Sequence, residues 1–192
     1  MPRRIGITKL DPYKVCTRDD VRLVLHTQDI YLRNFEERRE TLLLTQESMS
    51  EAIANEVMRG RGLQEVCVQT SGQSDPVFAA FIAAVNALEE RRDEIRLKFF
   101  ELSFEEGKFL DIVKALDSQS PEDRQFLVDA YSHDKDDEQL FEDYKSMFYV
   151  VFGRRDKDKI IRSAVGRLLR QKLDAVVADC AYKPPDNFNV AG

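Results

Sequence analysis

Long stretches without glycine or proline constrain the fold of this chain more than any other feature. Residues 21–47 contain neither residue, and the whole chain has eight glycines and six prolines among 192 residues. Average usage of the two together is about 12%, and sheet proteins with many tight turns need such chain breakers. Apolar residues within 21–47 also recur at helical spacing. The sequence therefore predicts an all-α fold.

Local start and stop signals divide residues 1–117 into long helices. Residues 17–20 have the pattern of a capping box ahead of a long amphipathic helix that packs on one partner helix. A second box at 48–51 predicts a break, followed by a shorter helix that ends at the glycines of 60–62 and a brief extended piece. Asp75-Pro76 predicts the next long helix, because proline in the first helical position loses no needed donor. A polar stretch at 103–106 predicts a kink in that helix.

The final third has shorter helical segments. Residues 120–123 (Ser-Pro-Glu-Asp) are a compact helix start, with a capping serine, proline in the first turn and acids at the positive helix end. We predict a middle helix over 138–151 and a last helix over 156–177. The expected architecture is a long N-terminal antiparallel helical arm (1–117), a small three-helix, helix-turn-helix-like unit (118–178) and a flexible tail (179–192).

Charge is distributed unevenly along the chain. The total is −6, but residues 154–172 hold eight basic and two acidic side chains, a net +6, so the remainder carries −12. Two predicted helices joined by a short turn that contains glycine are typical of a helix-turn-helix motif. The second helix of that motif enters the major groove of DNA. A solvated helix face is the alternative interpretation of such a basic cluster. The residues expected to contact duplex DNA are Arg154, Arg155, Lys157, Lys159, Arg162, Arg167 and Arg170.

Two segments of the last third resemble region four of the sigma-factor family, the promoter-reading helix-turn-helix of bacterial transcription initiation. They are KALDSQSPEDRQFLVDAY (114–131) and RSAVGRLLRQKL (162–173). The chain over about 18–178 is also similar to phage-encoded late-gene transcriptional activators. The resemblance implies a phage-type regulator that contacts host RNA polymerase. The helix at 138–151 is longer than the family's short one, and the last helix starts Arg-Arg-Asp-Lys where the family has Ser or Thr, which leaves open a unit that binds protein instead.

Other chemistries find weaker support in the sequence. His133 stands beside three aspartates, but these are adjacent rather than spaced around a glycine turn as in calcium loops, so a solvated loop that caps the next helix is the expectation. Cys67 with His26 as base has no recognisable nucleophile elbow around it. We therefore expect no enzyme, catalytic residue, cofactor or metal.

The sequence supports two functional hypotheses. The first is a cytoplasmic, DNA-binding transcriptional regulator that forms a homo-oligomer, with dimerisation or polymerase contact assigned to the arm. The second is a non-enzymatic helical oligomer or protein-interaction module, such as a phage assembly or host-inhibitor protein. No run of ~18 apolar residues is present, so no membrane partner is expected.

Overall fold

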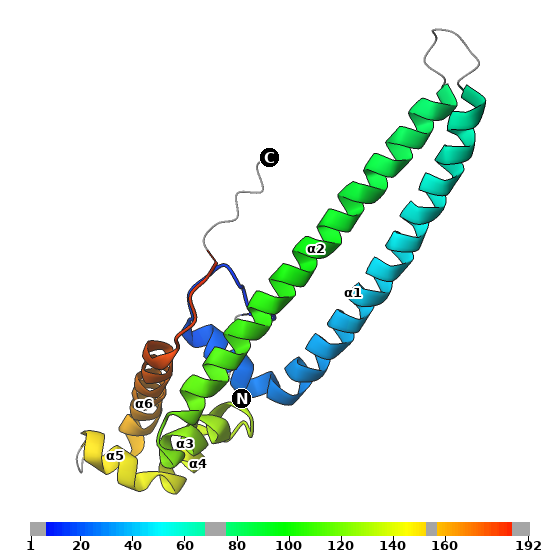
Figure 1. The fold of residues 1–192 in the computed structure, drawn as a ribbon. Helices are drawn as coiled ribbons and strands as arrows, with labels where there is room; N and C mark the ends of the chain where they lie inside the picture. The colour runs from blue at the N-terminus through cyan, green and yellow to red at the C-terminus, as the bar shows by residue number, and fades with distance from the viewer. Residues whose placement is uncertain (1–6, 68–75, 153–156, 186–192) are drawn as a thin grey trace. The chain divides into compact units, whose positions relative to one another are not determined.

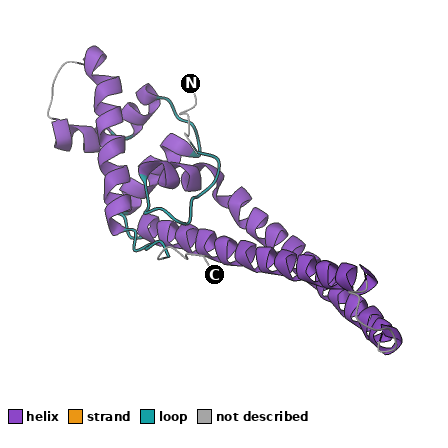
Figure 2. Ribbon diagram, turned by 90° about the horizontal axis from the view of Figure 1, so that it is seen from above, coloured by secondary structure: helices purple, strands orange, loops and turns teal. Residues whose placement is uncertain are grey.

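The computed structural model describes residues 7–67, 76–152 and 157–185. Within these ranges the side chains of residues 53, 56–67, 76–81, 150–152, 157–160 and 162 are not described. All regular secondary structure in the described ranges is helical, which confirms the predicted all-α class (Figure 2). The chain forms two compact units: unit 1 comprises residues 1–33 and 104–192, and unit 2 comprises residues 34–103.

The first helix, α1 (Arg18–Cys67), is 50 residues long and begins as predicted. The backbone N–H of Thr17 donates to the Asp20 carboxylate over 2.8 Å, and the Asp20 N–H donates to the Thr17 hydroxyl over 3.3 Å. These two bonds satisfy backbone donors that the first helical turn would otherwise leave without a partner. The capping box at 17–20 is therefore confirmed.

The predicted break at residues 48–51 is wrong, because α1 continues through it. The hydroxyls of Ser48 and Ser50 donate to the carbonyls of Thr45 and Gln46 in the preceding turn, at 2.9 Å each. Serine can bond backward in this way inside a helix as well as cap a new one. The predicted helix end at 60–62 is also wrong, since α1 extends to Cys67 and includes most of the expected extended piece.

The second helix, α2 (Pro76–Asp117), starts at the predicted proline and runs antiparallel beside α1 in unit 2 (Figure 1). It continues through 103–106 into unit 1, so the predicted kink there does not divide it into two helices. The described buried apolar side chains of unit 2 are few and lie along this helix pair: Phe35, Met49, Ile95 and Leu102.

The third helix, α3 (Pro121–Tyr131), confirms the start signal at 120–123. The Ser120 side chain accepts from the Asp123 N–H, and proline occupies the first turn. The next helix, α4 (Asp137–Asp143), is capped by Asp136 and Gln139 in a reciprocal box. The acidic loop therefore does cap the following helix, as expected.

The single middle helix predicted over 138–151 is wrong, because the chain forms two helices there. Helix α4 ends at Asp143. The next residue, Tyr144, leaves the helical region at φ −117° and ψ 32°, and α5 (Lys145–Phe152) follows. The Tyr144 ring meets Phe126 edge to face at 5.1 Å, and this packing holds the break in place. With α6 (Lys157–Asp179), the described part of 118–178 contains four helices rather than the predicted three.

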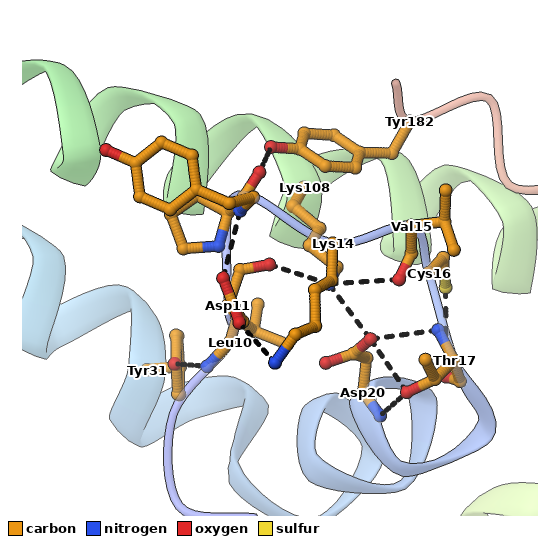
Figure 3. A network of polar contacts seen from close by, with 12 residues as sticks. Leu10, Asp11, Lys14, Val15, Cys16, Thr17, Asp20, Tyr31, Lys108 and Tyr182 are labelled. Atoms are coloured by element: carbon orange, nitrogen blue, oxygen red, sulfur yellow. Dashed lines mark hydrogen bonds and ion pairs between the residues drawn. The ribbon is translucent and has the colours of Figure 1, made fainter. Parts of the chain in front are cut away.

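Unit 1 is organised around a buried charged side chain, Lys108 on α2, shown in Figure 3. Its ammonium lies 2.9 Å from the Asp20 carboxylate and donates to the carbonyls of Asp11 (2.9 Å) and Val15 (3.5 Å). A buried ammonium is tolerated only when its donors are satisfied, and Lys108 has a partner for each of its three. The segment before α1 is thereby tied to the second half of α2.

One helical turn earlier, Glu105 on α2 forms a second buried polar contact. It accepts from the Tyr31 hydroxyl over 2.8 Å and pairs with Lys9 at 3.4 Å. The Tyr31 hydroxyl in turn accepts from the Leu10 N–H over 2.8 Å, and its ring stacks on Phe109. Glu105, one of the polar residues of the expected kink region, is therefore an interior residue of unit 1.

The two units divide the chain differently from the boundary predicted near residue 117. The described residues 7–33 and 104–117 group with α3–α6 rather than with residues 34–103. The prediction of a loose tail after 179 is wrong for residues 180–185. Tyr182 is buried and its hydroxyl donates to the Pro12 carbonyl over 2.5 Å. Residues 186–192 lie outside the described residues.

Removing the Lys108 charge should destabilise unit 1 strongly. A Lys108→Met variant keeps most of the side-chain volume but leaves the Asp20 carboxylate buried without its ammonium, which costs about 3–5 kcal/mol. Urea unfolding followed by circular dichroism measures the loss. Lys114→Met is the matched control, because the Lys114 side chain is 75% exposed. Equal stability of the two variants would contradict the structural role of Lys108.

Candidate nucleic-acid interface

The predicted DNA-binding segment ends in α6, which packs against α3, α4 and α5. Its buried apolar residues recur every three or four positions, and Val165, Leu168, Leu173 and Val176 have no exposed surface. Because this stripe faces the other helices of unit 1, the opposite face of α6 is available to solvent.

The structure describes two of the seven predicted DNA-contacting side chains. Arg154 and Arg155 lie outside the described residues. Lys157, Lys159 and Arg162 belong to α6, but their side chains also lie outside the described part. Arg167 and Arg170 are described, and both are exposed.

Arg167 and Arg170 lie on the solvent side of α6. They are three positions apart, and Ser163, four positions before Arg167, is exposed on the same side. The Arg170 Nε donates to the Gly166 carbonyl over 3.1 Å, which uses one of its five N–H donors. The remaining guanidinium donors have the geometry that suits two phosphate oxygens.

The second half of α6 is less positive than the sequence alone indicates. Lys172 is half-buried and its ammonium lies 2.7 Å from the Asp123 carboxylate. Asp174, one turn past Arg170, forms a two-point contact with Arg18 at the start of α1. Hydrogen bonds from Arg18 hold the pKa of the Asp174 carboxyl below its usual value. The positive surface of α6 is therefore expected to end near Arg170.

Helix α4 presents acidic groups close to its own N-terminal loop. Glu138, Glu142 and Asp143 line a shallow hollow together with Lys135 and Gln139. The Lys135 ammonium lies 3.0 Å from Asp143, so its charge is already paired. Three carboxylates repel a phosphate backbone, and a duplex would have to approach α6 from a side other than this hollow.

The Asp129 carboxylate fixes α3 against the loop and helix that follow it. One oxygen accepts from Gln125 (3.0 Å) and contacts His133 Nδ1 (2.8 Å). The other accepts from Lys135 (2.7 Å) and from the Tyr144 hydroxyl (2.8 Å). The hydrogen bond from Tyr144 to Asp129 therefore fixes the break between α4 and α5 against α3, and all three of these helices pack against α6.

The same contacts set the protonation of the Asp129 cluster. Burial alone would raise the pKa of Asp129, but the hydrogen bonds from Lys135, His133, Tyr144 and Gln125 lower it well below its usual range. The pKa of Lys135 is raised, chiefly by its hydrogen bond to Asp129. The cluster was not predicted from the sequence. The only feature of the local sequence that could have indicated this cluster is an aspartate among the apolar residues of α3.

The described residues give little support for a metal site, a nucleophilic active site or a membrane-spanning helix. No group of three or more His, Cys, Asp or Glu side chains in the described part of the chain is arranged to hold a metal ion. His26, considered as a base for Cys67, instead contacts the Tyr131 carbonyl through Nδ1 at 3.0 Å. No described helix is both long and apolar enough to cross a membrane.

An Asp129→Asn variant tests the carboxylate cluster. It should lose about 2–3 kcal/mol of unfolding free energy at pH 7, because Lys135 loses its charged acceptor. Wild-type stability should fall as the pH drops from about 5, because the lowered pKa of Asp129 stabilises the fold only while the carboxyl is ionised. The variant should lose less over that range. Urea unfolding at a series of pH values measures both effects.

Asp134→Asn is the control for this prediction. Asp134 is exposed and has a φ of 50°, a conformation that asparagine also adopts readily. Its stability should stay within about 0.5 kcal/mol of wild type. Parallel acid profiles for wild type and the Asp129→Asn variant would rule out the role assigned to this carboxylate.

Comparisons with known proteins identify no relative. No family model, curated protein or solved structure matches the chain.

Proposed function

We propose that the chain is a phage-type transcriptional regulator that binds duplex DNA through the basic residues of segment 154–172. The observation that supports this most is the charge asymmetry: this segment carries +6 while the rest of the chain carries −12. Arg167 and Arg170 are exposed on α6, and the apolar side of that helix is buried. A helix supported on one side and basic on the other is suited to lie against a polyanion.

In this proposal the positions along the segment have different tasks. The residues at its start, Arg154, Arg155, Lys157, Lys159 and Arg162, contact phosphates or base edges near the N-terminus of α6. Arg167 and Arg170, farther along, contact the DNA backbone and fix the register of the helix. Lys172 is excluded from this set because it already pairs with Asp123.

The long helices of unit 2 would serve assembly. A regulator of this class needs a surface for a second copy or for RNA polymerase, and unit 2 carries several apolar side chains that face solvent. Leu44 is 61% exposed and Phe100 is 60% exposed. We assign homo-oligomer formation or polymerase contact to this unit, and we place the protein in the cytoplasm, where DNA and polymerase are accessible.

The same exposed apolar residues favour the second candidate function. A helical oligomer or protein-interaction module, such as a phage assembly or host-inhibitor protein, would use them directly and would have no need for DNA. In that case the basic segment meets an acidic protein surface. Both candidates are non-enzymatic, and they differ in whether a duplex binds.

A salt titration of duplex binding tests the first candidate. Fluorescence anisotropy with a labelled mixed-sequence duplex should show binding at low salt that weakens as salt rises, because counterions are released from neutralised phosphates. The double variant Arg167→Ala/Arg170→Ala should bind roughly ten-fold more weakly. Its slope of log K against log salt should be smaller by about 2.

The charge-matched control is Arg91→Ala/Lys98→Ala, which removes two exposed positive charges from α2 in unit 2. It should leave both the affinity and the slope close to wild type. If control and test variants weaken binding equally, net charge rather than α6 drives the interaction. An unaltered slope in the α6 variant would remove these two residues from the interface.

Light scattering over a range of concentrations tests the role of unit 2. Self-association should be present in the wild type and lost in Leu44→Gln/Phe100→Gln, because polar side chains no longer gain from burial. Leu110→Gln, an equally conservative change at a 43% exposed site in unit 1, is the control. A chain that stays monomeric at every concentration excludes the homo-oligomer.

A further inference from the structure

Two of the three cysteines lie side by side in unit 1, although they are far apart in the sequence. Cys16 precedes α1 and Cys180 follows α6 directly, and both are free thiols. Tyr182, two residues after Cys180, donates its hydroxyl proton to the carbonyl of Pro12, four residues before Cys16, and Cys180 is close enough to Cys16 to affect the pKa of its thiol. Cysteines distant in sequence are brought into such contact only by the folded chain.

Neighbouring contacts hold the two segments against each other. The Tyr182 hydroxyl donates to the Pro12 carbonyl over 2.5 Å, and the Lys108 ammonium lies 5.7 Å from the centre of the Tyr182 ring. Lys108 also donates to the Val15 carbonyl, next to Cys16 (Figure 3). These contacts, formed by other residues, keep the two thiols close without a covalent bond.

We propose that Cys16 and Cys180 are a reversible disulfide site that joins the segment before α1 to the segment after α6. A disulfide needs its sulfurs at about 2.05 Å and its Cα atoms usually 4.4–6.8 Å apart, so two cysteines on neighbouring segments that are already held together can bond with little backbone movement. The product locks the C-terminal end of α6 onto the N-terminal segment. This site is independent of whether α6 binds DNA.

The two thiols differ in access, which determines the order of reaction. Cys16 is 8% exposed, whereas Cys180 is half-buried. Burial, and then the neighbouring Cys180, raise the pKa of the Cys16 thiol, so it reacts poorly by itself. Cys180 is therefore the point of entry for an oxidant, and Cys16 is the resolving thiol.

The oxidant we name is a small-molecule disulfide of the glutathione class. The Cys180 thiolate attacks one sulfur of oxidised glutathione, which forms a protein–glutathione mixed disulfide and releases one glutathione thiolate. The Cys16 thiolate then attacks the Cys180 sulfur and releases the second glutathione thiolate. The protein loses two hydrogens, and one oxidised glutathione becomes two reduced glutathiones.

The test uses the full chain with Cys67→Ser, so that only this pair can close. The native protein is equilibrated with glutathione buffers of increasing oxidation, quenched with acid, alkylated and analysed by intact mass and peptide mapping. We expect both thiols to disappear together, with a mass loss of 2 Da and a cross-linked peptide pair that contains Cys16 and Cys180. The thermal midpoint should rise by about 5–15 °C on oxidation, because a long loop is closed.

Two controls separate folded-state pairing from general thiol reactivity. The chain with Cys67→Ser and Cys16→Ala should stop at the Cys180–glutathione adduct, with no rise in midpoint. The Cys67→Ser protein in urea should show much less pairing at the same buffer ratio. The proposal is overturned if the native protein keeps Cys16 alkylatable while Cys180 carries glutathione, or if both thiols stay free in fully oxidised buffer.

Discussion

The buried Lys108–Asp20 ion pair is the constraint on which unit 1 depends. A charge taken out of water costs several kcal/mol unless its partners are complete, and here the partners come from α2, α1 and the segment before α1. Those parts of the chain must therefore fold together. The same requirement explains why the segment before α1 belongs to one unit with the second half of α2, and the Tyr182–Pro12 hydrogen bond brings the segment after α6 into that unit.

The support of α6 follows from this arrangement. The helix buries an apolar stripe against α3, α4 and α5, and the Asp129 carboxylate holds the turn between α3 and α4 in place. Ion pairs to Asp123 and Arg18 fix its second half. A basic surface on a helix held this firmly would present its side chains in a defined register, which recognition of a regular polyanion requires.

The sequence predicts features that are decided within a few neighbouring residues. The capping box at 17–20, the proline start of α2 and the Ser-Pro start of α3 depend on local hydrogen bonds and on proline geometry, and they are confirmed. The serines at 48–51 also form local hydrogen bonds, but their hydroxyls donate to carbonyls of the preceding turn instead of capping a new helix, so the predicted break is absent. Lys108, Asp129 and the break at Tyr144 acquire their roles from partners far along the chain, which periodicity does not reveal. For the basic segment, the composition predicts the net positive charge. It does not reveal that Lys172 forms an ion pair with Asp123, which only the folded structure shows.

Selection of bound duplexes from a random pool is the most direct measurement of the central claim. Immobilised wild-type protein should retain duplex at low salt and enrich it over successive rounds, because the basic segment neutralises phosphates and its N-terminal residues contact bases. The same selection with Arg154→Ala/Arg155→Ala/Lys157→Ala should retain far less. Retention by wild type no greater than by bare matrix would contradict a DNA-binding role and leave the protein-interaction module as the function of this chain.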